Sequence, residues 1–312
     1  MKFPFAIKDG AEFDAVGFGT NAVDHLIRVP MYPGHAEKIR LSGYSQMAGG
    51  EIASTMTGLR RLGLRTAYVG SFGDDAAGEI GRTSLVAEDV DISFSRTISG
   101  APTQTAFIIV DDATGERTII WNRDDSLKYT VDDTPAELMS RTKTLHMTPH
   151  DVEACIELAK RARSAGVVVS IDIDNTFDRV AELLPLIDVC IASSDLAGRL
   201  LDTDDQRTAL QAIAVNYGCA VVGVTLGSAG SLFYSGGQFI ETAGFAVPGG
   251  CVDTTGAGDA FRTGFLYGML TGLSVERSAV LANAVAALKC RASGARLGLP
   301  SEGELDAFLT AI

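Results

Sequence analysis

Short apolar runs alternate with amphipathic stretches along most of the chain. The runs that fit buried strands are residues 13–19, 67–70, 145–147, 167–171, 189–192 and 220–225. Apolar residues also recur at helical spacing, in residues 49–63, 152–165, 208–217, 257–271 and 274–291. Strands that alternate with helices form parallel sheets whose two faces are both covered. The pattern therefore predicts an α/β fold with three layers, α/β/α, around a doubly wound, mostly parallel sheet.

Two segments break this alternation and are predicted to be extended. Residues 21–44 contain Pro30, Pro33 and Gly34 among alternating apolar positions, which disfavours a helix. Farther along, the runs 105–110 and 117–121 flank a turn at 111–115, which is the pattern of a β-hairpin. We expect these segments to form one small accessory sheet.

Length and composition fit a single domain of residues 1–312, in which the inserted segments cover approximately 21–48 and 92–123. Hydrophobic residues make up 46% of the chain, which excludes a disordered protein. The net charge of −13 repels a phosphate backbone, so no nucleic acid is expected as a partner. No apolar run approaches a membrane span and no signal-peptide pattern opens the chain. We expect a cytoplasmic protein without a membrane partner.

The run Asp-Thr-Thr-Gly-Ala-Gly-Asp-Ala-Phe at 253–261 has the pattern of a phosphate-binding turn that opens a helix. Its small residues leave backbone N–H groups bare, and these bind phosphate and stabilise charge during phosphoryl transfer. Asp259 lies in the first helical turn, where the helix dipole is expected to keep its carboxylate ionised. We expect Asp259 to accept the proton of an attacking hydroxyl. Alone, the fragment is also typical of a glycine-rich loop before an ordinary helix acid.

Two other nucleotide-binding motifs are not supported by the sequence. The chain has no G-x-x-x-x-G-K-[ST], so a P-loop phosphotransferase is excluded by pattern. Residues 17–22 fit the dinucleotide fingerprint G-x-G-x-x-A after a strand, but the helix it requires would meet Pro30 and Pro33.

Several motifs together resemble the ribokinase-like, or PfkB, family of carbohydrate kinases. Residues 253–261 resemble its C-terminal signature, and residues 49–63, continued by 69–75, resemble its N-terminal signature. The run Val-Thr-Leu-Gly-Ser-Ala-Gly at 224–230 is similar to its nucleotide loop. The resemblance implies transfer of the γ-phosphate of ATP, with Mg²⁺, to a sugar hydroxyl. It also implies that the accessory sheet is a lid over the sugar.

The resemblance assigns roles to individual residues. It makes Asp259 the catalytic base, and it places the anion hole at Gly256, Ala257 and Gly258. The ATP-binding residues that it implies are Thr225, Gly227, Gly230 and Asn283. Those implied for the sugar are Asp24, Gly49, Gly50 and Ser54. Asp253 and Thr255 fall in a loop that holds a monovalent cation such as K⁺ in several members.

The chain departs from the family pattern at three places. Glu51 and Ser54 stand where asparagines are usual, which changes the hydrogen bonds offered to the sugar. Ser193 and Leu196 replace the Asn and Glu of an Asn-x-x-Glu motif that helps to organise magnesium and phosphate. Arg123 lies in a segment that faintly resembles the carboxylate-binding segment of 2-keto-3-deoxygluconate kinases, although a solvated surface arginine is the preferred interpretation.

These departures leave more than one function open. The acceptor is a sugar or a sugar derivative, with a 2-keto-3-deoxy sugar acid or a nucleoside as alternative classes. A second reading is a ligand-binding or regulatory member of the same fold with impaired catalysis, motivated by Ser193 and Leu196. A lid with an exposed strand edge is expected to be covered by a second copy of the chain, which predicts a homodimer.

Overall fold

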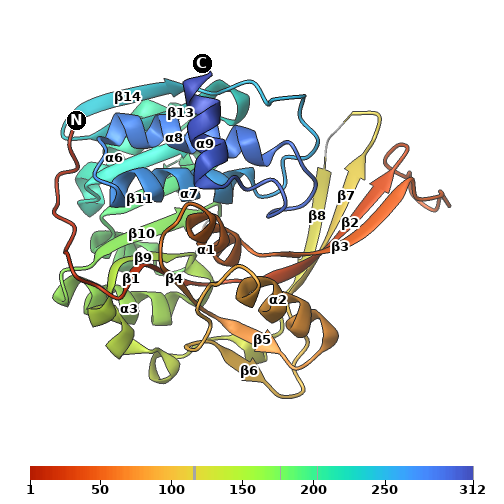
Figure 1. The fold of residues 1–312 in the computed structure, drawn as a ribbon, viewed down its shortest axis with the longest axis horizontal. Helices are drawn as coiled ribbons and strands as arrows, with labels where there is room; N and C mark the ends of the chain where they lie inside the picture. The colour runs from red at the N-terminus through yellow and green to blue at the C-terminus, as the bar shows by residue number, and fades with distance from the viewer. Residues whose placement is uncertain (115–116, 176, 202, 312) are drawn as a thin grey trace.

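A mostly parallel sheet forms the centre of the protein in the computed structural model, which describes residues 1–114, 117–175, 177–201 and 203–311. Its strand order is β14-β13-β12-β11-β10-β9-β1-β4 (Figure 1). The strands are β1 (Phe13–Phe18), β4 (Thr66–Val69), β9 (Thr142–Met147), β10 (Val168–Ile173), β11 (Val189–Ser193), β12 (Val221–Thr225), β13 (Gly230–Ser235) and β14 (Gln238–Ala243). Neighbouring strands from β12 to β4 run parallel, whereas β13 and β14 pair antiparallel. The predicted fold class is confirmed.

Helices cover both faces of this sheet. The helices are α1 (Glu51–Arg61), α2 (Ala76–Val86), α3 (Val152–Ser164), α4 (Val180–Leu183), α5 (Leu196–Leu201), α6 (Gln206–Tyr217), α7 (Ala257–Leu270), α8 (Val275–Lys289) and α9 (Glu302–Thr310). Helices α1, α7 and α8 pack on one face, and α3 to α6 pack on the other. In the part of the chain that the structure describes, no helix combines the length and apolar composition needed to cross a membrane.

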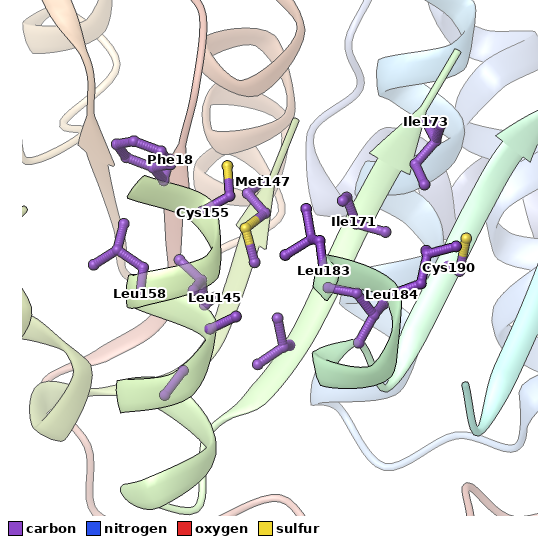
Figure 2. Close-up of a cluster of buried hydrophobic side chains, with 14 of the residues drawn as sticks. Phe18, Leu145, Met147, Cys155, Leu158, Ile171, Ile173, Leu183, Leu184 and Cys190 are labelled. Carbon is purple, nitrogen blue, oxygen red and sulfur yellow. The ribbon is translucent and has the colours of Figure 1, made fainter. Parts of the chain in front are cut away.

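The strands are apolar on both sides because both of their faces are buried. Consecutive residues of a strand point to opposite faces, so Val168 packs with the α1, α7 and α8 cluster while Val169 packs with the α3 cluster. Figure 2 shows part of the second cluster, in which α3 contributes Cys155 and Leu158 against Met147 and Ile171 of the sheet. This double burial explains the continuous apolar runs in the sequence.

A second sheet projects from the body of the molecule (Figure 1). Its order is β3-β2-β7-β8, with β2 (Ala22–Val29), β3 (Gly43–Gly49), β7 (Thr105–Asp111) and β8 (Arg117–Asn122). Strands β7 and β8 pair antiparallel, which confirms the predicted hairpin, and β2 pairs parallel to β7. Gly115 of the predicted turn lies outside the described residues. We call this four-stranded sheet the lid.

The second inserted segment begins later than the sequence suggested. Residues 92–104 were expected in the lid, but β6 (Arg96–Ile98) pairs instead with β5 (Ser71–Gly73) beside the main sheet. The backbone N–H of Gly73 also donates to the hydroxyl of Thr103, at 3.0 Å. These contacts attach the segment to the body, so the lid strand starts only at Thr105.

Candidate active site

A cavity of about 430 Å³ lies between the end of β12, the start of α7 and the side of α8. The four residues predicted to bind ATP line it together with two residues of the predicted anion hole: Thr225, Gly227, Gly230, Asn283, Ala257 and Gly258. Phe245, Val247 and Ala286 give it an apolar wall. Adjacent phosphate-binding amides and apolar walls suit a nucleotide, whose phosphates and base need these two environments.

The turn before α7 has the geometry of an anion-binding helix start. Gly256 is the N-cap residue and has a φ of 73°, a left-handed conformation that favours glycine. A Cβ on Gly256 would lie 2.7 Å from the Cα of Ala295, so the position also has no room for a side chain. Since glycine offers no capping side chain, the amide of Gly258 stays available to a ligand, whereas that of Ala257 donates to the carbonyl of Thr254 at 3.1 Å. The helix dipole adds positive potential at the same place.

Asp259 is more basic than the sequence predicted. The expectation that the helix dipole keeps it ionised is wrong, because burial, above all, raises the pKa of Asp259 to about 7. The carboxylates of Asp172, Asp174 and Asp24 raise the pKa further, and the guanidinium of Arg262 opposes them. Arg262 also forms a buried ion pair with Asp172. A carboxyl group with a pKa near neutrality is suited to accept a proton at physiological pH.

The residues predicted to bind the sugar meet where the lid joins the body. Asp24 on β2 is buried, and a Cβ on Gly49 would lie 2.1 Å from its Oδ2. Gly50, the N-cap of α1, has a φ of 89°, and a Cβ there would lie 2.4 Å from the Cα of Asn21. The two glycines therefore allow β2 and β3 to approach each other around the carboxylate of Asp24.

A buried arginine that sequence reasoning missed holds this junction together. Arg296 follows α8, and its Nε donates to the hydroxyl of Ser54 at 3.3 Å while its Nη1 donates to that of Ser84 at 2.7 Å. Its Nη2 donates to the carbonyl of Gly49. Burial raises the pKa of Asp24 to about 6, and the charge of Arg296 opposes this rise. Ser54 therefore contacts Arg296, a pairing that no sequence motif indicated.

Glu51, one of the departures from the family pattern, is close enough to Asp259 for the two charges to interact. Its Oε2 accepts a hydrogen bond of 3.3 Å from Thr20 and lies 3.8 Å from Nδ1 of His150. Burial raises the pKa of Glu51 well above its usual range, and the carboxylates of Asp174 and Asp172 raise it further. A protonated carboxyl donates one hydrogen bond. Glu51 can thus supply a donor where the family usually has an asparagine amide.

Arg123 differs from both sequence expectations. Its Nη1 and Nη2 donate to the two carboxylate oxygens of Asp151, at 2.8 and 2.7 Å, and Nη2 also donates to the carbonyl of Leu127. The side chain is only 12% exposed, so it is not a solvated surface arginine. Because both Nη groups of Arg123 already donate to Asp151, the guanidinium cannot bind a substrate carboxylate in the same bidentate way.

The missing Asn-x-x-Glu motif has a structural explanation. Ser193 ends β11, and its hydroxyl donates to Oδ1 of Asp195 at 2.8 Å. Leu196 is fully buried in the cluster on the α3 face of the sheet. Ser193 therefore takes part in a surface hydrogen bond, and Leu196 takes part in the hydrophobic core. Among the described residues, no three His, Cys, Asp or Glu side chains form a group that could hold a metal ion.

Arg117 is a second cation that sequence reasoning missed. It begins β8 of the lid, lines the cavity, and its Nη1 donates to the hydroxyl of Thr254 beside the anion turn. Among the cavity-lining residues of the described chain, it is the one basic side chain. Only the pairing of the lid with the body brings it there, since its sequence neighbours carry no phosphate-binding motif.

The structure thus combines an α/β/α domain with a lid, a helix start without a capping side chain and a half-buried carboxylate, an arrangement compatible with a kinase of small molecules. The sequence profile described as pfkB family carbohydrate kinase matches residues 20–302. The chain belongs to this family, and it is a carbohydrate kinase, an enzyme that transfers a phosphoryl group.

Relatives with several substrates resemble the whole chain. An ATP-dependent ribose-1-phosphate kinase of Halopiger xanaduensis is 30% identical and covers 92% of this chain and 95% of its own. A ribokinase of Haemophilus influenzae is 27% identical over 93% of this chain and 96% of its own. The structure of Arabidopsis thaliana ribokinase complexed with ribose and ATP matches with a TM-score of 0.82 and 25% identity, covering 95% and 98% of the two chains.

Proposed function

We propose that this kinase transfers the γ-phosphate of ATP to a hydroxyl of a sugar or sugar derivative held at Asp24, with Asp259 as the general base. The observation that carries the proposal is the place of Asp259, a half-buried carboxyl group in the first turn of α7, directly after two residues that line the cavity. Its pKa, raised to about 7, matches the task of accepting a hydroxyl proton. Asp24 accepts hydrogen bonds from other hydroxyls of the acceptor.

The proposed reaction uses the anion turn and the base together. As the acceptor hydroxyl attacks the γ-phosphorus, its proton passes to Asp259 and the bond to the β-phosphate oxygen breaks. The backbone amides at Gly256, Ala257 and Gly258 stabilise the charge on the transferring phosphoryl group. Mg²⁺ would neutralise phosphate charge. We infer that the nucleotide phosphates hold the ion, because Ser193 and Leu196 leave no Asn-x-x-Glu pair to organise it.

The acceptor is proposed to be a pentose or a pentose derivative. The two relatives above are named for ribose and ribose 1-phosphate, and a nucleoside kinase of Methanothermobacter thermautotrophicus is 27% identical over 96% of this chain. A sugar acid is less well supported as the acceptor, because the guanidinium of Arg123 already pairs with the carboxylate of Asp151. The test is ADP release with Mg-ATP across ribose, ribose 1-phosphate, ketohexoses, sugar acids and nucleosides. Background rates with every acceptor, despite bound ATP, would favour the regulatory protein instead.

Arg117 is expected to bind the ATP phosphates from the lid. It is the basic side chain of the cavity lining, and the net charge of −13 gives ATP no long-range attraction. Arg117→Gln is therefore expected to raise the KM for ATP by about tenfold, the loss of one charge-assisted hydrogen bond. Arg28→Gln is the matched control, because Arg28 pairs with Asp112 on the lid. An unchanged KM in Arg117→Gln would contradict the assignment.

The lid is proposed to pair with the lid of a second copy. Its face opposite Asp24 exposes a cluster of Tyr44, Phe107 and Ile120, with Phe107 stacked on His25 at 4.8 Å. Strand β8 is an exposed edge along its whole length. A second lid covers both features by two-fold symmetry. Light scattering should give twice the mass of the chain, and Phe107→Glu should reduce it to the monomer; a monomeric wild type contradicts the proposal.

A further inference from the structure

A fully buried lysine lies beneath the anion turn. Lys289 is the last residue of α8, it has no exposed surface, and its Nζ donates a hydrogen bond of 2.9 Å to the backbone carbonyl of Asp253. Removing an ammonium from water is costly unless its surroundings compensate the charge. Burial lowers the pKa of Lys289, while the carboxylates of Asp253 and Asp259 favour the charged form. A buried cation at this place requires an explanation.

The ammonium attaches the turn to the end of α8. The carboxylate of Asp253 accepts hydrogen bonds from the backbone N–H groups of Thr255, at 2.8 Å, and Gly294, at 2.7 Å. The backbone N–H of Val252 donates to the carbonyl of Cys290 at 2.9 Å. The carbonyl of Asp253 faces Lys289 while its carboxylate fixes two amides, so this residue is held on both sides. The anion-binding amides begin three residues later in the sequence.

Helix capping alone does not account for Lys289. A cation near a helix C-terminus usually contacts the last carbonyls of its own helix. Arg291 already does so at this helix end, because its Nε donates to the carbonyl of Leu288 at 2.8 Å while Nη2 pairs with Glu304 on the surface. Lys289 instead reaches a carbonyl of another segment. Among the described residues, no carboxylate forms an ion pair with it, so its charge remains directed at the turn.

We propose that Lys289 is the built-in cation of the phosphate-binding turn. It holds Asp253, and through it the amides at 256–259, in place, and it supplies fixed positive charge near the transferring phosphate. Lys289 is thus a positioning residue, and the turn needs no monovalent cation such as K⁺. The resemblance had implied a cation at Asp253 and Thr255, so the proposal reverses that expectation. Its kinetic consequence rests on the proposed phosphoryl transfer.

Cation dependence tests the proposal without relying on activity. Thermal unfolding is measured in KCl, NH₄Cl and choline chloride at equal ionic strength. The wild type is expected to have the same Tm in all three salts. Lys289→Met is expected to have a lower Tm in choline chloride and to recover part of the loss in KCl or NH₄Cl, whose small cations fit the vacated position. Arg291→Met, the matched control at the same helix end, is expected to show no such salt effect.

Steady-state kinetics gives the second measurement. The wild-type kcat is expected to be the same in KCl and choline chloride, whereas Lys289→Met is expected to lose about tenfold to a hundredfold in kcat through a misplaced turn. Ammonium should restore part of this loss, and Lys289→Arg should lose less than Lys289→Met. A wild-type Tm or kcat that rises specifically with K⁺ overturns the proposal, even where Lys289→Met does not fold. If no acceptor supports activity, only the proposed function is contradicted, because the Tm comparison still tests the role of Lys289.

Discussion

Asp259→Asn is expected to lower kcat by about a thousandfold to ten-thousandfold, the upper part of the range for a general base. The amide keeps the shape of the side chain but cannot accept the hydroxyl proton at neutral pH. The backbone amides of the turn before it remain unchanged. Binding of ATP and of the acceptor should therefore change little. Single-turnover kinetics with Mg-ATP, together with equilibrium binding of both ligands, measures the two effects separately.

The pH profile adds an independent reading of the same residue. Since the pKa of Asp259 is raised to about 7, the base is protonated below this pH and ionised above it. In the wild type, log kcat/KM should rise with a slope approaching one below about pH 7 and level off above it. Asp259→Asn should lose this limb. Asp306→Asn, on the exposed surface of α9, is the control and should keep both the rate and the profile. A residual kcat near the wild-type value would remove Asp259 from the mechanism.

Gly49→Ala is expected to lower kcat/KM for the acceptor by about a hundredfold, the effect of misplacing a binding group by about 1 Å. The new Cβ would lie 2.1 Å from Oδ2 and 2.5 Å from Cγ of Asp24. The carboxylate must therefore move away from the position in which it accepts the acceptor hydroxyls. The nucleotide cavity is not lined by Gly49 or Asp24, so the Kd for ATP should stay the same.

Gly303→Ala is the matched control for this substitution. Gly303 lies in α9, and nothing lies within 4 Å of the Cβ that it would gain. Alanine is favoured over glycine inside a helix, so this variant should be slightly more stable, by about 0.5–1 kcal/mol, and fully active. Thermal unfolding of both variants separates a moved Asp24 from a general loss of folding. Unchanged acceptor kinetics in a folded Gly49→Ala would show that Asp24 does not bind the acceptor.

Strand and helix positions followed closely from the spacing of apolar residues. Strands buried on both faces, such as β10, are mostly apolar on both faces, and this signal is local to the sequence. The sequence did not predict β13 and β14, which extend the sheet antiparallel from β12. Their partners are selected by register across the sheet, and β14 is partly exposed, so the apolar signal is weak there. The helix α9 and its capping box at Ser301 were missed for lack of a long apolar pattern.

Candidate site residues were predicted where backbone chemistry depends on consecutive residues. The turn from Asp253 to Asp259 is continuous in sequence, and its glycine at the left-handed N-cap is a local requirement. The cations were missed because each acts on a distant segment. Arg117 comes from the lid, Arg296 reaches back to Gly49, and Lys289 reaches Asp253. No spacing rule relates an arginine or lysine to an acceptor so far away in the chain.

The sequence by itself determined the layered α/β architecture, the lid hairpin and the anion turn, because apolar periodicity and glycine-dependent turns are set by neighbouring residues. The tertiary structure decided the electrostatics of the site. Burial and the nearby carboxylates of Asp172 and Asp174 raise the pKa of Asp259, although the helix dipole acts in the opposite direction. The guanidinium of Arg123 is engaged by the carboxylate of Asp151. Desolvation and pairing depend on which segments meet in space, and only the folded chain defines those meetings.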